Sequence, residues 1–181
     1  MNTRYPIHDL DSAPAGSRPA LEATAARLGK IPNLVGTMAA VPQLINSFLQ
    51  LTQTAETLTL PALEREIVAL VAGVEIGCRH CIAMHTGALK RLGAPQSVIA
   101  AIRAGRPLDD LRLAALLDFT RQVIAERGAV GDDTQSAFFA VGFTDVQALE
   151  IVFLVSVLSM SMYSSRLAHV PLDDALKALA S

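Results

Sequence analysis

Apolar residues recur at helical spacing along most of this chain. In residues 61–76, Ile67, Leu70, Val71 and Val74 form one apolar stripe. This spacing is typical of a helix that packs one face against a core. No segment alternates apolar and polar residues as a half-buried strand does. The pattern therefore predicts an all-α fold.

Glycine, proline and capping residues set the expected ends of the helices. Gly29 follows the first apolar segment as a C-cap glycine does, Pro42 can occupy the first turn of a helix, and Thr144 with Gln147 forms a capping box. Asn33 is expected to cap the second helix. We expect helices at about 18–28, 33–40, 42–56, 61–76, 78–92, 95–104, 108–127, 132–140 and 144–166, with a weak turn or helix from 171.

The chain of 181 residues is long enough for one domain with a substantial core. Its first 17 residues hold Pro6, Pro14 and Gly16, which favour an extended arm. The sequence therefore predicts an N-terminal arm over residues 1–17 and a single all-helical domain over residues 18–181.

Composition narrows the possible partners. Half of the residues are apolar, but aromatic residues are few and Trp is absent, so Leu, Ala, Val and Ile must build the core. The net charge is −2 and no basic block is present, so we expect no nucleic-acid partner. The mean hydropathy of +0.39 is high for a soluble monomer. It indicates extensive subunit interfaces, which resemble a core cut in half.

Neither a membrane nor export is expected. The longest uncharged run, residues 151–165, is too short to span a bilayer and includes serines, so a buried helix explains it better. The N-terminal residues lack the apolar stretch of a signal peptide. We expect a cytoplasmic protein, and in that reducing compartment a lone C-x-x-C is more often catalytic or metal-binding than a permanent disulfide.

The chemistry of this sequence is concentrated in residues 75–85, EIGCRHCIAMH. On a regular helix, Cys78, Cys81 and His85 fall within an arc of roughly 60°. His85 lies four residues after Cys81, a spacing at which helical side chains meet, so it could act as a base for that thiol. Gly77 places Cys78 near a helix N-terminus, where partial positive charge favours the reactive thiolate. Cys81 is expected to lie deeper and to be less exposed than Cys78.

Two further residues belong to the candidate site. His80 points roughly 100° away from Cys81 on a regular helix, so we expect it to be a site residue rather than the base. Glu66 begins a row of small residues at helical spacing, Ala69, Gly73 and Gly77. That row would let the motif helix pack closely, with Glu66 alongside it.

The run REIVALVAGVEIGCRHCIAMHTGALKRLG resembles the carboxymuconolactone decarboxylase superfamily, in its alkylhydroperoxidase D-like, peroxidase-related branch. The signature of that branch, E-x(11)-C-x-H-C-x(3)-H, is met at Glu66, Cys78, His80, Cys81 and His85. The similarity extends more weakly to IPNLVGTMAAVPQL and FTDVQALEIVFLVS, and together these segments cover most of residues 30–170. One departure is Leu60-Pro61, where family members often have Ser-Pro.

The resemblance implies an alkylhydroperoxidase D-like helical bundle that assembles into trimers or hexamers. It implies reduction of organic hydroperoxides without metal, haem or another cofactor. In that case Cys81 is the peroxidatic cysteine and Cys78 the resolving one, and Glu66, His80 and His85 form a proton relay. A dithiol reductant, either a lipoylated protein or a thioredoxin-like protein, would restore the thiols, reaching the more exposed Cys78.

Other interpretations of the same residues stay open. The cysteines could be two buried small residues, or they could join His85 and either Glu66 or His80 as metal ligands. The disulfide could serve a non-catalytic redox sensor. The chain could also be a lactone enzyme like the decarboxylase of the superfamily, whose cysteines would be incidental.

Overall fold

The computed structural model describes residues 4–180, and its elements are helices. They are α1 (Arg18–Leu28), α2 (Asn33–Met38), α3 (Pro42–Ala55), α4 (Ala62–Ile76), α5 (Arg79–Arg91), α6 (Gln96–Arg103), α7 (Leu111–Ala125), α8 (Asp132–Ala140), α9 (Asp145–Leu167) and α10 (Asp174–Lys177), preceded by the short 3₁₀-helix η1 (Ala15–Ser17). The expected all-α fold is confirmed for the described residues.

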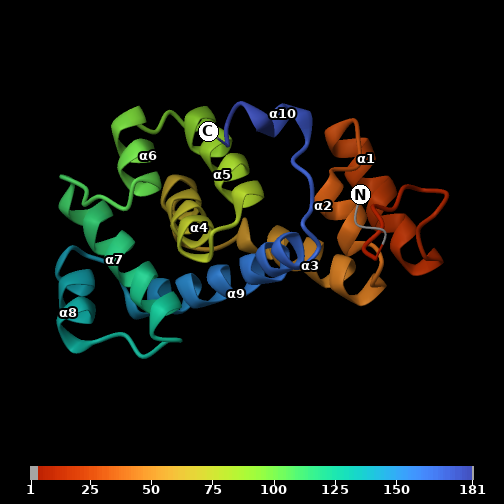
Figure 1. Ribbon diagram of the computed structural model, residues 1–181. Coiled ribbons are helices and arrows are strands. Elements are labelled where there is room, and N and C mark those ends of the chain that lie inside the picture. Colours follow the sequence, from red (N-terminus) through yellow and green to blue (C-terminus); the bar gives the residue numbers. More distant parts are fainter. Residues whose placement is uncertain (1–3, 181) are drawn as a thin grey trace.

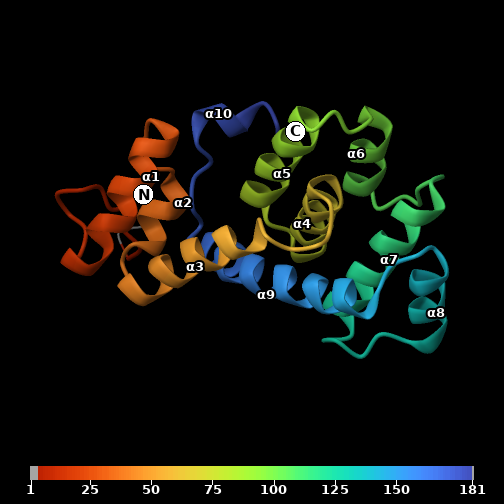
Figure 2. The same cartoon turned by 180° about the vertical axis from the view of Figure 1, so that it is seen from behind.

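Helix α4 lies at the centre of the molecule. It packs against α5, α6, α7 and α9, and the long helix α9 runs beneath it (Figure 1). The stripe expected on this helix is buried at Ile67, Leu70 and Val71, which join one core with residues of α6, α7, α8 and α9. Helices α1, α2 and α3 form the other end of the molecule, as the reverse view shows (Figure 2). Their apolar side chains form smaller clusters of their own.

Most helix ends follow the expected signals. Gly29 and Gly77 have positive φ at the ends of α1 and α4, and Thr144 with Gln147 forms both hydrogen bonds of the capping box of α9. Asn33 is a correction. It is the first residue of α2 instead of its cap, and its side-chain amide donates to the carbonyl of Pro171 in the C-terminal segment. The Asn33 side chain therefore binds a segment 138 residues further along the chain instead of capping its own helix.

Residues 4–14 contain turns and irregular backbone, and they lie against α2. The backbone N–H of His8 donates to the carbonyl of Gly36, and the Ser17 hydroxyl donates to the carbonyl of Ala39. Gly36 is needed for this approach, because a Cβ there would meet the His8 carbonyl at 2.6 Å. The division into an arm and one domain stays a prediction.

Helix α9 is long and apolar enough to cross a membrane by composition alone, with a mean hydropathy of 1.7. It packs against α2, α3, α4, α5 and α7, which is typical of a core helix. Several of its apolar side chains nevertheless remain exposed in the single chain, namely Val146, Leu149, Val152, Tyr163 and Leu167.

Candidate active site

The candidate site lies where α4 ends and α5 begins. Gly77 has φ +70°, which reverses the chain between the two helices, and the carbonyl of Gly77 accepts a hydrogen bond from Arg166 of α9 at 2.7 Å. Gly73 lets the helices approach, since a Cβ on it would lie 3.3 Å from the backbone nitrogen of Ile82. The close packing expected from the row of small residues is therefore confirmed at Gly73.

Cys78 is the N-cap of α5, so it lies just outside the helix with an extended backbone. Its Sγ accepts the backbone N–H of Cys81 at 3.4 Å. The expected helical arc consequently applies to Cys81 and His85 but not to Cys78. The cap geometry still brings the two sulfurs together, at 3.0 Å.

Both cysteines are free thiols with no exposed surface in the single chain. The expectation that Cys78 is the better exposed of the two is therefore wrong. Each packs against small or apolar side chains of α4 and α9, including Ala69, Leu158 and Met162. A thiol at the entrance of a helix was expected to face solvent, but α9 covers this end of α5.

The two thiols differ strongly in acidity. The pKa of Cys78 is lowered to about 6, chiefly because the Cys81 thiol donates a hydrogen bond to its sulfur. The Cys81 backbone N–H and the Ser165 hydroxyl add to this effect, whereas burial opposes it. The pKa of Cys81 is raised, because its proton is held by the Cys78 sulfur and because burial disfavours a second thiolate. The pair therefore carries one negative charge at neutral pH, and hydrogen bonds hold it mainly on Cys78.

Glu66 and His85 form the second part of the site. The Glu66 Oε2 lies 2.7 Å from the His85 Nδ1, which joins α4 to α5. His85 is buried one turn after Cys81, and its Nε2 has no hydrogen-bond partner among the described residues. A carboxylate on Nδ1 favours the tautomer that carries its proton there, so Nε2 is left as a proton acceptor.

His80 is buried on a different side of α5. Its Nε2 lies 3.9 Å from Asp173 of the C-terminal segment, and its Nδ1 has no partner within residues 4–180. Burial lowers the pKa of His80 by disfavouring the imidazolium, although Asp173 opposes this. His80 is therefore neutral at pH 7. The expectation that it belongs to the site without being the base of Cys81 stays a prediction.

The other acids of α4 have structural partners. Glu64 is buried and forms two contacts with Arg112 of α7, at 2.7 and 3.2 Å, while Glu75 pairs with Arg121. No group of three or more His, Cys, Asp and Glu side chains within residues 4–180 is arranged to hold a metal ion.

Three residues of the site were not found from sequence. Ser161 and Ser165 of α9 offer hydroxyls to Cys81 and Cys78 respectively, and Asp173 faces His80. The serines are spaced one helical turn apart in the uncharged segment, which is the only local sign that they share a face. Asp173 carries no such sign, because a chain reversal after α9 brings it to the site.

Residues 42–122 match the model of the Carboxymuconolactone decarboxylase family. This segment contains all five signature residues, so the match falls on the part of the chain that carries the candidate site. The resemblance seen in the sequence is confirmed.

Solved structures share its fold at low sequence identity. An uncharacterized peroxidase-related protein with an alkylhydroperoxidase AhpD core, from Ralstonia eutropha JMP134, is 21% identical with a TM-score of 0.83, covering 98% of this chain and 95% of its own. A peroxidase-related protein from Silicibacter sp. TM1040 is 20% identical with a TM-score of 0.76, and the match covers 94% of this chain and 90% of the Silicibacter protein. The debrominase Bmp8, solved as a cysteine-to-alanine variant with 2,3,4-tribromopyrrole, is 18% identical with a TM-score of 0.80, covering 99% and 96%. A comparison with curated proteins finds no match by sequence. The chain therefore has the alkylhydroperoxidase D-like fold.

Proposed function

We propose that this protein is a thiol-dependent peroxidase that reduces organic hydroperoxides through a Cys78–Cys81 disulfide cycle. The observation that carries the proposal is the pair of sulfurs 3.0 Å apart, with the pKa of Cys78 lowered to about 6. Such a pair supplies a thiolate for attack and a second thiol within reach of the product. The match of residues 42–122 to the Carboxymuconolactone decarboxylase family and the peroxidase-related structural neighbours support the same reaction class.

In the first step the Cys78 thiolate attacks the terminal oxygen of R–O–OH. The O–O bond breaks, an S–O bond forms, and the departing alkoxide takes a proton from water to become the alcohol. Cys78 is then a sulfenic acid. We assign the attack to Cys78 because the helix terminus, the Cys81 N–H and the Ser165 hydroxyl all stabilise its thiolate. This assignment departs from the one that the family resemblance implies.

In the second step the Cys81 sulfur attacks the sulfenic sulfur, an S–S bond forms, and the hydroxyl leaves as water. Cys81 must lose its proton during this attack, and the proton passes through His85 to the leaving hydroxide, since the His85 Nε2 is buried and has no hydrogen-bond partner within residues 4–180. Glu66 stabilises the resulting imidazolium from Nδ1. A cellular dithiol, either a lipoylated protein or a thioredoxin-like protein, returns the disulfide to two thiols and closes the cycle in the cytoplasm.

The test is stopped-flow oxidation of the reduced protein with a panel of alkyl hydroperoxides. Mass spectrometry follows the loss of the two thiols, and dihydrolipoamide serves as the recycling dithiol. We expect a Cys78–Cys81 disulfide within one chain and multiple turnovers. A variant with both cysteines changed to Ser is the control and should consume no peroxide.

The competing interpretations give different results in this experiment. Two free thiols after treatment would exclude the redox cycle. A disulfide that forms but does not turn over with any dithiol would favour the redox sensor. Lactone decarboxylation that survives in the double Cys→Ser variant would favour the decarboxylase-like enzyme.

A further inference from the structure

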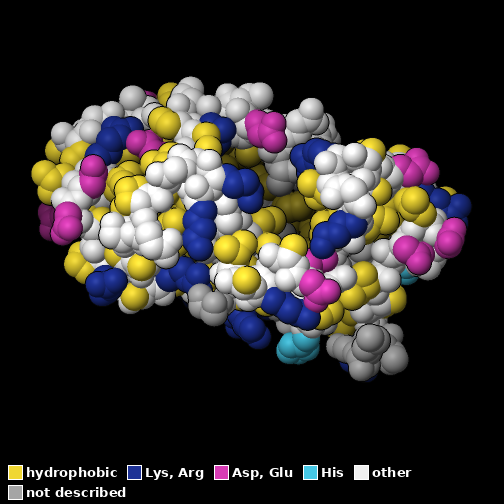
Figure 3. Space-filling model, turned by 90° about the horizontal axis from the view of Figure 1, so that it is seen from above, with side chains coloured by type: hydrophobic (Ala, Val, Ile, Leu, Met, Phe, Trp, Pro, Cys, Tyr) yellow, Lys and Arg dark blue, Asp and Glu magenta, His cyan; other side chains and the backbone are white. Residues whose placement is uncertain are grey.

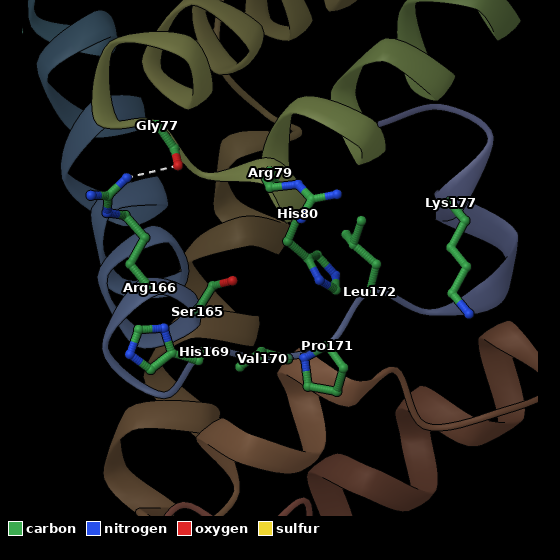
Figure 4. Close-up of a pocket in the computed structure, with 10 residues that line it drawn as sticks. All are labelled: Gly77, Arg79, His80, Ser165, Arg166, His169, Val170, Pro171, Leu172 and Lys177. Carbon is green, nitrogen blue, oxygen red and sulfur yellow. Dashed lines mark hydrogen bonds between the residues drawn. The ribbon is translucent and has the colours of Figure 1, made fainter. Parts of the chain in front are cut away.

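A cavity of about 640 Å³ opens at the start of α5, and Gly77 and Arg79, the two chain neighbours of Cys78, are in its lining. It lies between the start of α5, the end of α9 and the C-terminal segment, and its lining includes His80 and Ser165 (Figure 4). Both residues reach Cys78, since the Ser165 hydroxyl and the His80 backbone N–H each donate to its sulfur. Cys81 is hydrogen-bonded to Ser161, which is not part of the lining. Cys78 itself is buried and is not part of the lining, so His80 and Ser165 lie between the cavity and its sulfur.

The charge of the cavity wall is positive. Arg79, Arg166 and Lys177 contribute to the lining, and no carboxylate does. Arg166 is engaged with the carbonyl of Gly77, and Lys177 forms an ion pair with the exposed Asp174. Seen from above, the molecule is hollowed between its two parts, with Lys and Arg side chains at the rim and apolar atoms below (Figure 3).

Among the described residues, Arg79 is the cation of this wall without a hydrogen-bond or ion-pair partner. It forms no hydrogen bond or ion pair within residues 4–180, and its guanidinium extends beside His80 toward Leu172 (Figure 4). Asp173, whose carboxylate lies 3.9 Å from the His80 ring, is held by Lys30 at 3.4 Å and by the backbone N–H of Asn33. A guanidinium that no acid within residues 4–180 neutralises is suited to a carboxylate ligand.

A buried polar atom also marks the cavity as a binding site. His80 is 4% exposed, lines the cavity, and has a buried Nδ1 without a partner in the described part of the chain. Such an orphan costs free energy unless a ligand or water completes its hydrogen bonding. Val170, Pro171 and Leu172 form an apolar wall beside it. The cavity thus offers a cation, an apolar surface and a buried imidazole next to the reactive thiol.

We propose that the substrate is an organic hydroperoxide that carries a carboxylate, bound by Arg79. The carbon chain lies along residues 170–172, and the hydroperoxide group reaches the His80 Nδ1 and the Cys78 sulfur. This inference rests on the proposed peroxidase function and names its substrate class. The reaction remains the two-step cycle given above, in which R–OOH and two thiols give R–OH, water and a disulfide.

The experiment compares 6-hydroperoxyhexanoate with its methyl ester as oxidants of the reduced protein. We expect the acid to react about tenfold faster than the ester, since a charged hydrogen bond is lost with the ester. Arg79→Gln should remove this preference by slowing the acid alone. Arg91→Gln changes an exposed arginine at the other end of the same helix and should leave the preference intact.

Hexanoate, which cannot oxidise thiols, gives a readout that is independent of activity. Titration calorimetry should show hexanoate binding to the wild type and to Arg91→Gln, and binding weakened about tenfold in Arg79→Gln. Equal reaction of acid and ester, or equal hexanoate binding by the wild type and Arg79→Gln, would overturn the carboxylate site while leaving the peroxidase intact. If neither peroxide oxidises the thiols, the proposed function fails, and the substrate class that rests on it fails too.

Discussion

The carboxylate of Glu66 and the imidazole of His85 meet at 2.7 Å across the contact between α4 and α5. Nineteen residues separate them in the sequence. The contact leaves the Nε2 of His85 as a buried atom without a partner in residues 4–180, one helical turn from Cys81. In the proposed cycle this imidazole is the base for Cys81, the resolving thiol, whose pKa is raised by its hydrogen bond to Cys78 and by burial.

Glu66→Gln and His85→Gln should each slow disulfide formation while leaving the first oxidation of Cys78 nearly unchanged. General-base assistance contributes ~10²–10⁴-fold, so the sulfenic acid should accumulate in both variants. Mass spectrometry with a sulfenic-acid trap measures this. Glu75→Gln is the control, because Glu75 lies on the same helix but pairs with Arg121. Unchanged disulfide rates in both variants, with native circular dichroism, would remove Glu66 and His85 from the mechanism.

The roles of the two cysteines separate in single variants. Cys81→Ser should still react once with peroxide and retain a trapped sulfenic acid on Cys78. Cys78→Ser should react far more slowly, because burial raises the pKa of the remaining thiol at position 81. A trapped sulfenic acid on Cys81 in Cys78→Ser, formed at the wild-type rate, would restore the assignment that the family resemblance implies.

The rate of the first oxidation should depend on pH with a midpoint near 6. The pKa of Cys78 is lowered to about 6. The reactive thiolate is therefore protonated as pH falls through that value, and deprotonation is nearly complete above pH 7. The rate should rise about tenfold between pH 5 and 7 and then level off. Stopped-flow measurements over pH 5–9 test this. A rate that keeps rising through pH 8.5, as for a free thiol, would show that the hydrogen bonds do not lower the pKa of the Cys78 thiol.

The protein should form a homo-oligomer, and we expect a trimer or a hexamer. The basis is the exposed apolar row on α9, where Leu149 is 71%, Tyr163 61% and Leu167 65% exposed in the single chain. Light scattering of the purified protein measures the mass. Leu149→Glu should shift the mass toward the monomer, whereas Leu28→Glu, at an exposed position on α1, should not. A wild-type monomer at micromolar concentration would contradict the assembly.

Local signals in the sequence were sufficient for the helices and for part of the site. Glycine and capping residues give the helix ends because their effect acts within one turn, as at Gly77 and Thr144. The pairing of Glu66 with the motif helix followed from the row of small residues. The burial of Cys78 could not be predicted in this way, because α9, which covers it, lies about 80 residues further along the chain. Ser165, Asp173 and Arg79 were likewise missed, since their roles depend on where the last helix and the C-terminal segment return.

Gly73 sets the separation between the helix that carries Glu66 and the helix that carries Cys81 and His85. A Cβ at this position would lie 3.3 Å from the backbone nitrogen of Ile82, which is a tight contact. An alanine at this position would move the two helices apart by a few tenths of an ångström. The fold could absorb that movement more easily than the 2.7 Å contact between Glu66 and His85 could. Engineering of this scaffold for other oxidants should therefore keep Gly73 fixed and vary the cavity wall. The Glu66–His85 contact and the cavity wall lie on different faces of α5, so one can be changed without the other.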